Sequence, residues 1–138
     1  MSPFQLETTG PVGDRAILQV TGEVDVYTAP MLREQLRDLA AKGAVHLIVD
    51  LSRVEFLDST GLGALVGGLK RLREAHGSLV LVVSTPRTLR IFQITGLTNV
   101  LAVNRSLQDA ITADPGWRHA AESEAGSVHQ WCQQHGLS

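Results

Sequence analysis

Two short apolar runs, separated by one amphipathic helix, constrain the fold of this chain more than any other feature. Val45–Asp50 is apolar enough to form a strand covered on both faces, and Leu79–Val83 is continuously apolar. Between them, a single stripe of leucine and valine predicts a helix from about Ser59 to Ala75. A strand, a crossing helix and a second strand indicate a βαβ unit, in which the two strands run parallel.

Similar signals continue the alternation on both sides of this unit. Turn residues, capping residues and apolar spacing predict, in chain order, an edge strand Phe4–Thr9, a turn at residues 10–13, a strand Arg15–Thr21, a helix between Thr28 and Gly43, a helix Pro86–Ile94, a strand Val100–Val103 and a helix Ser106–Thr112. We therefore expect an α/β fold with a mixed, mostly parallel β-sheet of four to five strands and helices packed mainly on one face.

The composition changes near Asp114-Pro115-Gly116, and the chain of 138 residues fits one ordinary domain. We expect a main domain over residues 1–113 and a C-terminal extension over 114–138 that is helical or flexible and lies outside the main core. Trp117 and Trp131 predict that the extension docks back on the domain or makes a weak homodimer contact. Limited proteolysis near Pro115 distinguishes the two cases, because a free extension is cleaved rapidly and a packed one is protected.

Charge and composition exclude several classes of protein. The net charge of -2 argues against a general nucleic-acid binder, which would carry a basic patch. No stretch approaches the roughly 20 mostly apolar residues of a membrane span, and no signal-peptide pattern opens the chain, so a cytoplasmic protein is expected. The single cysteine, Cys132, excludes an internal disulfide. His129, Cys132 and His135 are spaced by three, but a zinc site usually needs a fourth ligand, and no metal is expected.

The stretch around residue 59 carries the most functional information. Asp58, Ser59 and Thr60 fall where a loop after the strand meets the helix, and any one of them could cap its free N–H groups. Capping does not explain the glycines, each of which costs the helix ~1 kcal/mol relative to alanine. They are Gly61, Gly63, Gly67 and Gly68. Either a neighbouring strand or helix approaches the helix backbone closely, or a partner protein or a phosphate does.

The sequence gives little support to the hypothesis that Ser59 is a catalytic residue. A serine nucleophile on an elbow requires the pattern GxSxG, and Leu57 stands where the first glycine would be. His46 falls in a predicted buried strand and His76 at a helix end, so no base is placed beside Ser59. Neither GxGxxG after a strand nor GxxxxGK[ST] occurs. We expect no catalytic residue and no cofactor.

Three segments, in the right order over roughly residues 4–112, carry a family resemblance. Leu57-Asp58-Ser59-Thr60-Gly61-Leu62-Gly63 resembles the phosphorylation motif of bacterial anti-sigma factor antagonists, the prototypes of the STAS domain. Gly22-Glu23-Val24-Asp25, followed by Thr28-Ala29, resembles the second signature of that family. Leu89–Leu97 resembles its third helix and the exit from it. The resemblance implies a mixed sheet with helices on one side and a protein that is not an enzyme.

The resemblance also implies partners. Family members bind an anti-sigma factor, often also a serine kinase with a GHKL-type ATP site, and so release a sigma factor. The kinase phosphorylates the serine after the motif aspartate, here Ser59, and a PP2C-type phosphatase usually restores the free form. Many members have a second serine where this chain has Thr60, which could itself accept phosphate. The alternative is a STAS-type scaffold or sensor module in another signalling assembly.

Physical chemistry suggests how phosphate at Ser59 would act. Phosphate adds a charge of about -1.5 to -2, which the N-terminus of a helix tolerates because its dipole and free N–H groups favour anions. The same charge weakens a desolvated, acidic contact with a partner. The residues expected to form that contact are Asp25, Asp58, Thr60, Gly61 and Gly63. For Asp25, the alternative is that it caps the helix beginning near Thr28 or hydrogen-bonds a turn.

Overall fold

The computed structural model describes residues 3–137, which form one five-stranded sheet and six helices. The strands stand in the order β1-β2-β3-β4-β5; β1 is antiparallel to β2, and the others are parallel to their neighbours. Strand bounds are β1 Gln5–Val12, β2 Arg15–Val24, β3 His46–Leu57, β4 Ser78–Val82 and β5 Ala102–Asn104. The predicted mixed, mostly parallel α/β fold is confirmed.

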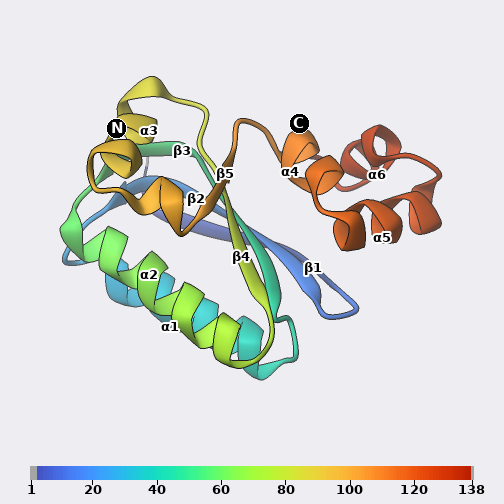
Figure 1. The fold of residues 1–138 in the computed structure, drawn as a ribbon, viewed down its shortest axis with the longest axis horizontal. Coiled ribbons are helices and arrows are strands. Elements are labelled where there is room, and N and C mark those ends of the chain that lie inside the picture. The colour runs from blue at the N-terminus through green and yellow to red at the C-terminus, as the bar shows by residue number, and fades with distance from the viewer. Residues whose placement is uncertain (1–2, 138) are drawn as a thin grey trace.

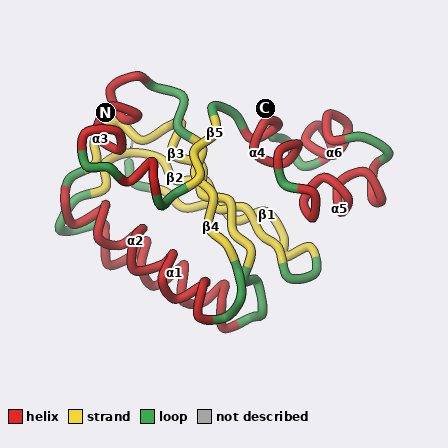
Figure 2. Tube along the Cα trace, viewed as in Figure 1, coloured by secondary structure: helices red, strands yellow, loops and turns green. Residues whose placement is uncertain are grey.

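Helices cover both faces of this sheet (Figures 1 and 2). Their bounds are α1 Ala29–Ala41, α2 Ser59–Glu74, α3 Pro86–Ile94, α4 Leu107–Ala113, α5 Pro115–Ala125 and α6 Val128–Gln134, with a 3-10 turn at Leu97–Asn99. The long helices α1 and α2 pack against one face, and α4, α5 and α6 lie on the opposite side. None of the helices within residues 3–137 combines the length and apolar character needed to cross a membrane.

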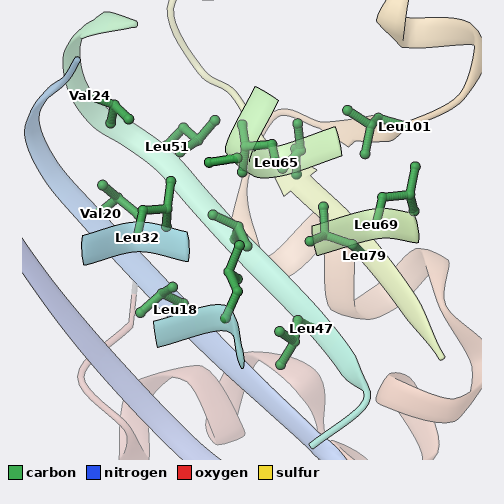
Figure 3. Close-up of a cluster of buried hydrophobic side chains, with 14 of the residues drawn as sticks. Leu18, Val20, Val24, Leu32, Leu47, Leu51, Leu65, Leu69, Leu79 and Leu101 are labelled. Atoms are coloured by element: carbon green, nitrogen blue, oxygen red, sulfur yellow. The ribbon is translucent and has the colours of Figure 1, made fainter. Parts of the chain in front are cut away.

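The main core lies between the sheet and helices α1 to α3. Alternate residues of the central strands, such as Leu18 of β2, Leu47 of β3 and Leu79 of β4, point toward the apolar stripes of α1 and α2 (Figure 3). Leu32 and Leu65 meet them from those helices. The stripe that predicted α2 is therefore the one that this core buries.

A second core fills the other face, and the sheet, α4 and the C-terminal extension all contribute to it. Trp117 and Trp131 are 1% exposed and stack edge to face, with ring centroids 6.0 Å apart. They share a cluster with Ile17, Ile48 and Val82 of the sheet. The prediction that tryptophan docks the extension on the domain is confirmed: the extension lies outside the main core, as expected, but is packed in this second one. The continuous apolar strands need cover on both faces, and the extension provides it.

Strand β3 differs from its predicted length. It does not end at Asp50 with a loop to α2 but continues as strand through Leu57, paired with β2. The register shifts twice, between Gln19 and Thr21 and between Gly22 and Glu23, so the alternation of apolar and polar side chains is interrupted. The interrupted pattern explains why the sequence suggested a loop here.

Candidate functional site

The parallel strands β2 and β3 carry two of the motif segments to the same edge of the sheet. Glu23 is paired with Phe56, and Val24 with Leu57. The N–H of Asp58 donates to the carbonyl oxygen of Val24 at 3.1 Å. The segments beginning at Gly22 and at Leu57, far apart in sequence, therefore form one continuous surface around the first turn of α2.

Asp58 is the residue that caps α2. Its Oδ1 accepts from the N–H of Thr60 at 2.9 Å and from that of Gly61 at 3.1 Å, and the Thr60 hydroxyl also donates to it. The Thr60 hydroxyl, followed by these N–H groups, holds the pKa of the Asp58 carboxyl below its ordinary value, although partial desolvation opposes the shift. Asp58 is therefore a fixed anion whose hydrogen bonds are directed into its own helix.

Ser59 is the first residue of α2, and its side chain is exposed. Within the part of the chain that the structure describes, the Ser59 hydroxyl has no hydrogen-bond partner, whereas the neighbouring Thr60 hydroxyl is bound to Asp58 and only half-exposed. Of these adjacent hydroxyls, Ser59 is thus the one that is accessible to an enzyme and free to react.

The four glycines of α2 divide into two pairs with different surroundings. A Cβ at Gly61 would lie 2.5 Å from Leu57 Cδ1 and 2.7 Å from Val24 Cγ1, and a Cβ at Gly68 would lie 2.9 Å from Leu36 Cδ1. Gly61 and Gly68 are buried and allow close packing within the domain. Cβ atoms at the exposed Gly63 and Gly67 would meet nothing within 4 Å. Of the two glycines expected in the partner contact, the structure gives Gly61 a packing role and leaves Gly63 on the surface.

Asp25 organises the turn between β2 and α1. Its Oδ1 accepts from the N–H of Tyr27 at 2.9 Å and that of Thr28 at 3.1 Å. The Thr28 hydroxyl donates to the carbonyl oxygen of Glu23 at 2.7 Å and accepts from the N–H of Asp25 at 2.9 Å. Thr28 precedes α1 as expected, but its side chain makes no capping bond to that helix. The turn that Asp25 holds lies beside Asp58, because the preceding residue, Val24, pairs with Leu57 and accepts the N–H of Asp58.

A group of exposed apolar side chains, not predicted from the sequence, lies at this edge. Val26 is 59% exposed, Tyr27 84%, Met31 55% and Phe56 49%. They come from the turn after β2, the first turn of α1 and the end of β3, all at the edge that carries Ser59. We call these four residues, with Asp25, Ser59 and Gly63, the Ser59 surface. Apolar periodicity could not indicate them, because they belong to no core-facing stripe.

Comparison with known proteins identifies the family. The family model described as the STAS domain matches residues 4–110. The chain belongs to the STAS domain family. It is 41% identical over 90 residues to the anti-sigma-B factor antagonist of Listeria monocytogenes, an alignment that covers 65% of this chain and 79% of that protein.

Solved structures show the same fold. An anti-sigma factor antagonist from Mycobacterium paratuberculosis matches with a TM-score of 0.73 and 32% identity, over 80% of this chain and 93% of that one. The phosphorylated form of the Bacillus cell fate determinant SpoIIAA matches with a TM-score of 0.62 and 25% identity, over 80% and 98%. The expectation that this STAS domain is not an enzyme is confirmed by its relatives, which are regulatory antagonists.

His46 of the STAS domain and His135 of the C-terminal extension lie in contacts elsewhere. His46 begins β3, at the end opposite Ser59, where its Nδ1 lies 2.9 Å from the Ser78 hydroxyl and its Nε2 3.6 Å from Asp14. His135 lies against the Trp131 ring, with centroids 4.1 Å apart, and 3.5 Å from Glu124. Neither residue faces the Ser59 surface.

Proposed function

We propose that this protein is an anti-sigma factor antagonist that is switched off by phosphorylation at Ser59. In its unphosphorylated form it binds an anti-sigma factor, a serine kinase of the GHKL type, and so releases a sigma factor. A PP2C-type phosphatase regenerates the binding form, and the exchange takes place in the cytoplasm, where sigma factors act. The proposal rests on one observation above all: Ser59, the first residue of a helix already capped by Asp58, is exposed and makes no side-chain hydrogen bond to any described residue.

The Ser59 surface has the composition of a protein contact. Exposed apolar side chains from the turn after β2, the first turn of α1 and the end of β3 lie at the edge that carries Ser59, and grouped exposed apolar residues mark interaction sites. Gly63 leaves open space one helical turn after Ser59, so a partner can approach the backbone of α2. Tyr27, the most exposed of the apolar residues, is of a type that often dominates binding energy.

Charge accounts for the switch. Asp58, whose carboxyl pKa is lowered, directly precedes Ser59, and Asp25 follows Val24, which accepts the N–H of Asp58. A phosphate dianion there can be accepted by the free helix, because the dipole and N–H groups of its first turn favour anions. In a complex the same dianion is desolvated next to two carboxylates, at a cost on the order of several kcal/mol, which is enough to reverse a binding equilibrium.

Phosphate mapping tests the assignment. The purified protein is incubated with ATP and an extract of its native cells, and the phosphorylated residue is located by mass spectrometry. We expect phosphate on Ser59, none in the Ser59→Ala variant, and unchanged phosphorylation of the Thr60→Val variant. Phosphate on Thr60 alone, or phosphate that survives Ser59→Ala, would falsify the assignment to Ser59.

A further inference from the structure

A cavity of about 520 Å³ opens beside the carboxyl end of β4. It exists because β3 pairs with β4 only from His46 to Asp50 and then continues to Leu57 without it. The space beyond β4 lies between residues 52–55 of β3 and the start of α3. In parallel sheets this is where ligands bind, outside the carboxyl ends of the strands. The volume falls within the range of about 300–1,000 Å³ that is usual for small-molecule sites.

The walls of this cavity are cationic and rich in hydroxyl groups. Arg53 enters from β3 and Arg87 from α3, and neither forms an ion pair within residues 3–137. The hydroxyl groups belong to Thr21, Ser52, Thr85 and Thr88. Among residues 3–137, the only carboxylate in the lining is that of Glu55, which already has an interaction partner. Two guanidinium groups with their donors uncommitted, facing one space, suit a ligand with several anionic oxygens.

The start of α3 adds further donors. Thr85 precedes this helix but makes no side-chain cap bond to it; its hydroxyl donates instead to the Thr88 hydroxyl at 2.9 Å. Pro86 has no N–H, so the N–H groups of Arg87 and Thr88 are the first that the helix presents. Thr88 is 5% exposed, so its hydroxyl is held in place at the cavity wall. The start of α3 therefore favours an anion in the same cavity that the two arginines line.

A second, smaller cavity of about 200 Å³ is also lined by Ser52 and Arg53. It adds the side chains of Arg105, Ser84 and Ser106. Its carboxylate, Asp50, is 5% exposed and accepts from the N–H of Ser52 at 3.0 Å and from Gln19 Nε2 at 3.4 Å. Arg53 therefore lines both cavities, the larger one together with Arg87 and the smaller one together with Arg105.

We propose that the larger cavity binds a small organic phosphate, whose oxygens are held by Arg53 and Arg87. Phosphate is preferred to carboxylate because guanidinium pairs, threonine hydroxyls and a helix start together offer more donors than one carboxylate can accept. The site shares no residue with the Ser59 surface. It therefore goes beyond the antagonist function, and either proposal can fail without the other.

Ribose 5-phosphate and inorganic pyrophosphate are the probes for this site, and citrate at equal ionic strength is the carboxylate control. Titrations of the full chain are followed by ¹H–¹⁵N NMR. We expect the phosphate probes to shift the amide signals of residues 52–55 and 85–88, and citrate to shift them much less. Arg87→Gln should weaken binding about tenfold or more, because a hydrogen bond to a charged group is lost.

Arg90→Gln is the matched control, since Arg90 is an exposed arginine of the same helix that does not line the cavity. This variant should bind the phosphate probes as the wild type does. Equal weakening by Arg87→Gln and Arg90→Gln would overturn the proposal, as would equal responses to citrate and pyrophosphate or shifts spread over the other surface arginines. The affinity of Arg87→Gln for an anti-sigma factor, measured in parallel, should equal that of the wild type. This measurement tests the antagonist function separately from the phosphate site.

Discussion

The N–H of Asp58 donates to the carbonyl oxygen of Val24 at 3.1 Å, and this bond joins the end of β2 to the start of α2. Through it, the turn organised by Asp25 and the helix start that exposes Ser59 are held next to each other. A substitution in either segment can therefore alter the surface formed by the other.

Replacing Ser59 by aspartate should separate folding from binding. We expect Ser59→Asp to keep the circular dichroism spectrum and thermal midpoint of the wild type, because a carboxylate is tolerated in the first turn of a helix. Its affinity for the anti-sigma factor, measured by calorimetry, should fall strongly, whereas Ser59→Ala should bind constitutively. Equal affinity of Ser59→Asp and wild type would remove the electrostatic mechanism.

Tyr27 tests the apolar part of the Ser59 surface. The Tyr27→Ala variant should bind the anti-sigma factor more weakly by about 2 kcal/mol, as expected for an aromatic residue at the centre of an interface. Its unfolding free energy should barely change, since the side chain is 84% exposed. Ile94→Ala is the control, because Ile94 is 77% exposed on α3 and lies outside this surface. Similar losses of affinity in both variants would argue against the Ser59 surface.

The two kinds of glycine in α2 should respond in opposite ways to alanine. Gly61→Ala should lower the unfolding free energy by about 1–3 kcal/mol, because its methyl group would overlap with Val24, whose branched side chain has little freedom to move. Gly63→Ala should raise it by up to about 1 kcal/mol, because the added methyl group meets open space and alanine favours helix. Urea denaturation of both variants measures the difference, and a stable Gly61→Ala protein would contradict the packing role.

The Asp58 cap predicts a pH dependence with a definite sign. Because the pKa of its carboxyl is lower in the folded chain than its ordinary value of 3.8, Asp58 stabilises the fold above that value. This contribution should be lost as the pH falls below 3.8 through the folded pKa. Asp58→Asn should be less stable at neutral pH and should lose less stability on acidification. Parallel curves of unfolding free energy against pH for the two proteins would show that the cap makes no such contribution.

The C-terminal extension should behave as part of the folded unit. Trp117→Ala should cost about 3–5 kcal/mol of unfolding free energy, because a fully buried aromatic ring is removed from the second core. Gln133→Ala, an exposed change on α6, should cost little. The native chain should also resist limited proteolysis near Pro115, and rapid cleavage there would indicate that the extension does not stay packed.

The limits of prediction from sequence can be seen in particular elements. The Pro86–Ile94 helix was predicted with the bounds that it has, because proline at its start and Thr95-Gly96 at its end are local signals. The continuous apolar strand at Val45 indicated cover on both faces, but the cover comes from a cluster that joins Ile48 to Trp117 and Trp131, which no local pattern reveals.

The candidate site divides in the same way. The helix start at Asp58 and Ser59 could be predicted from the sequence because capping and charge act between neighbouring residues. The structure assigns the cap to Asp58. The burial of Gly61 depends on the approach of Val24 from another strand, and the exposed Phe56 on a register shift in β3. These features arise only when β2 and β3 pair, so the sequence leaves the alternatives for Gly61 open.

The turn from Asp25 to Thr28 is cross-linked by its own side chains: the carboxylate holds two N–H groups, and the threonine hydroxyl bridges Glu23 and Asp25. A docking protein therefore meets a loop whose shape exists before contact. Complex formation then loses little backbone entropy at this loop, and most of the apolar area that Tyr27 brings can count toward affinity.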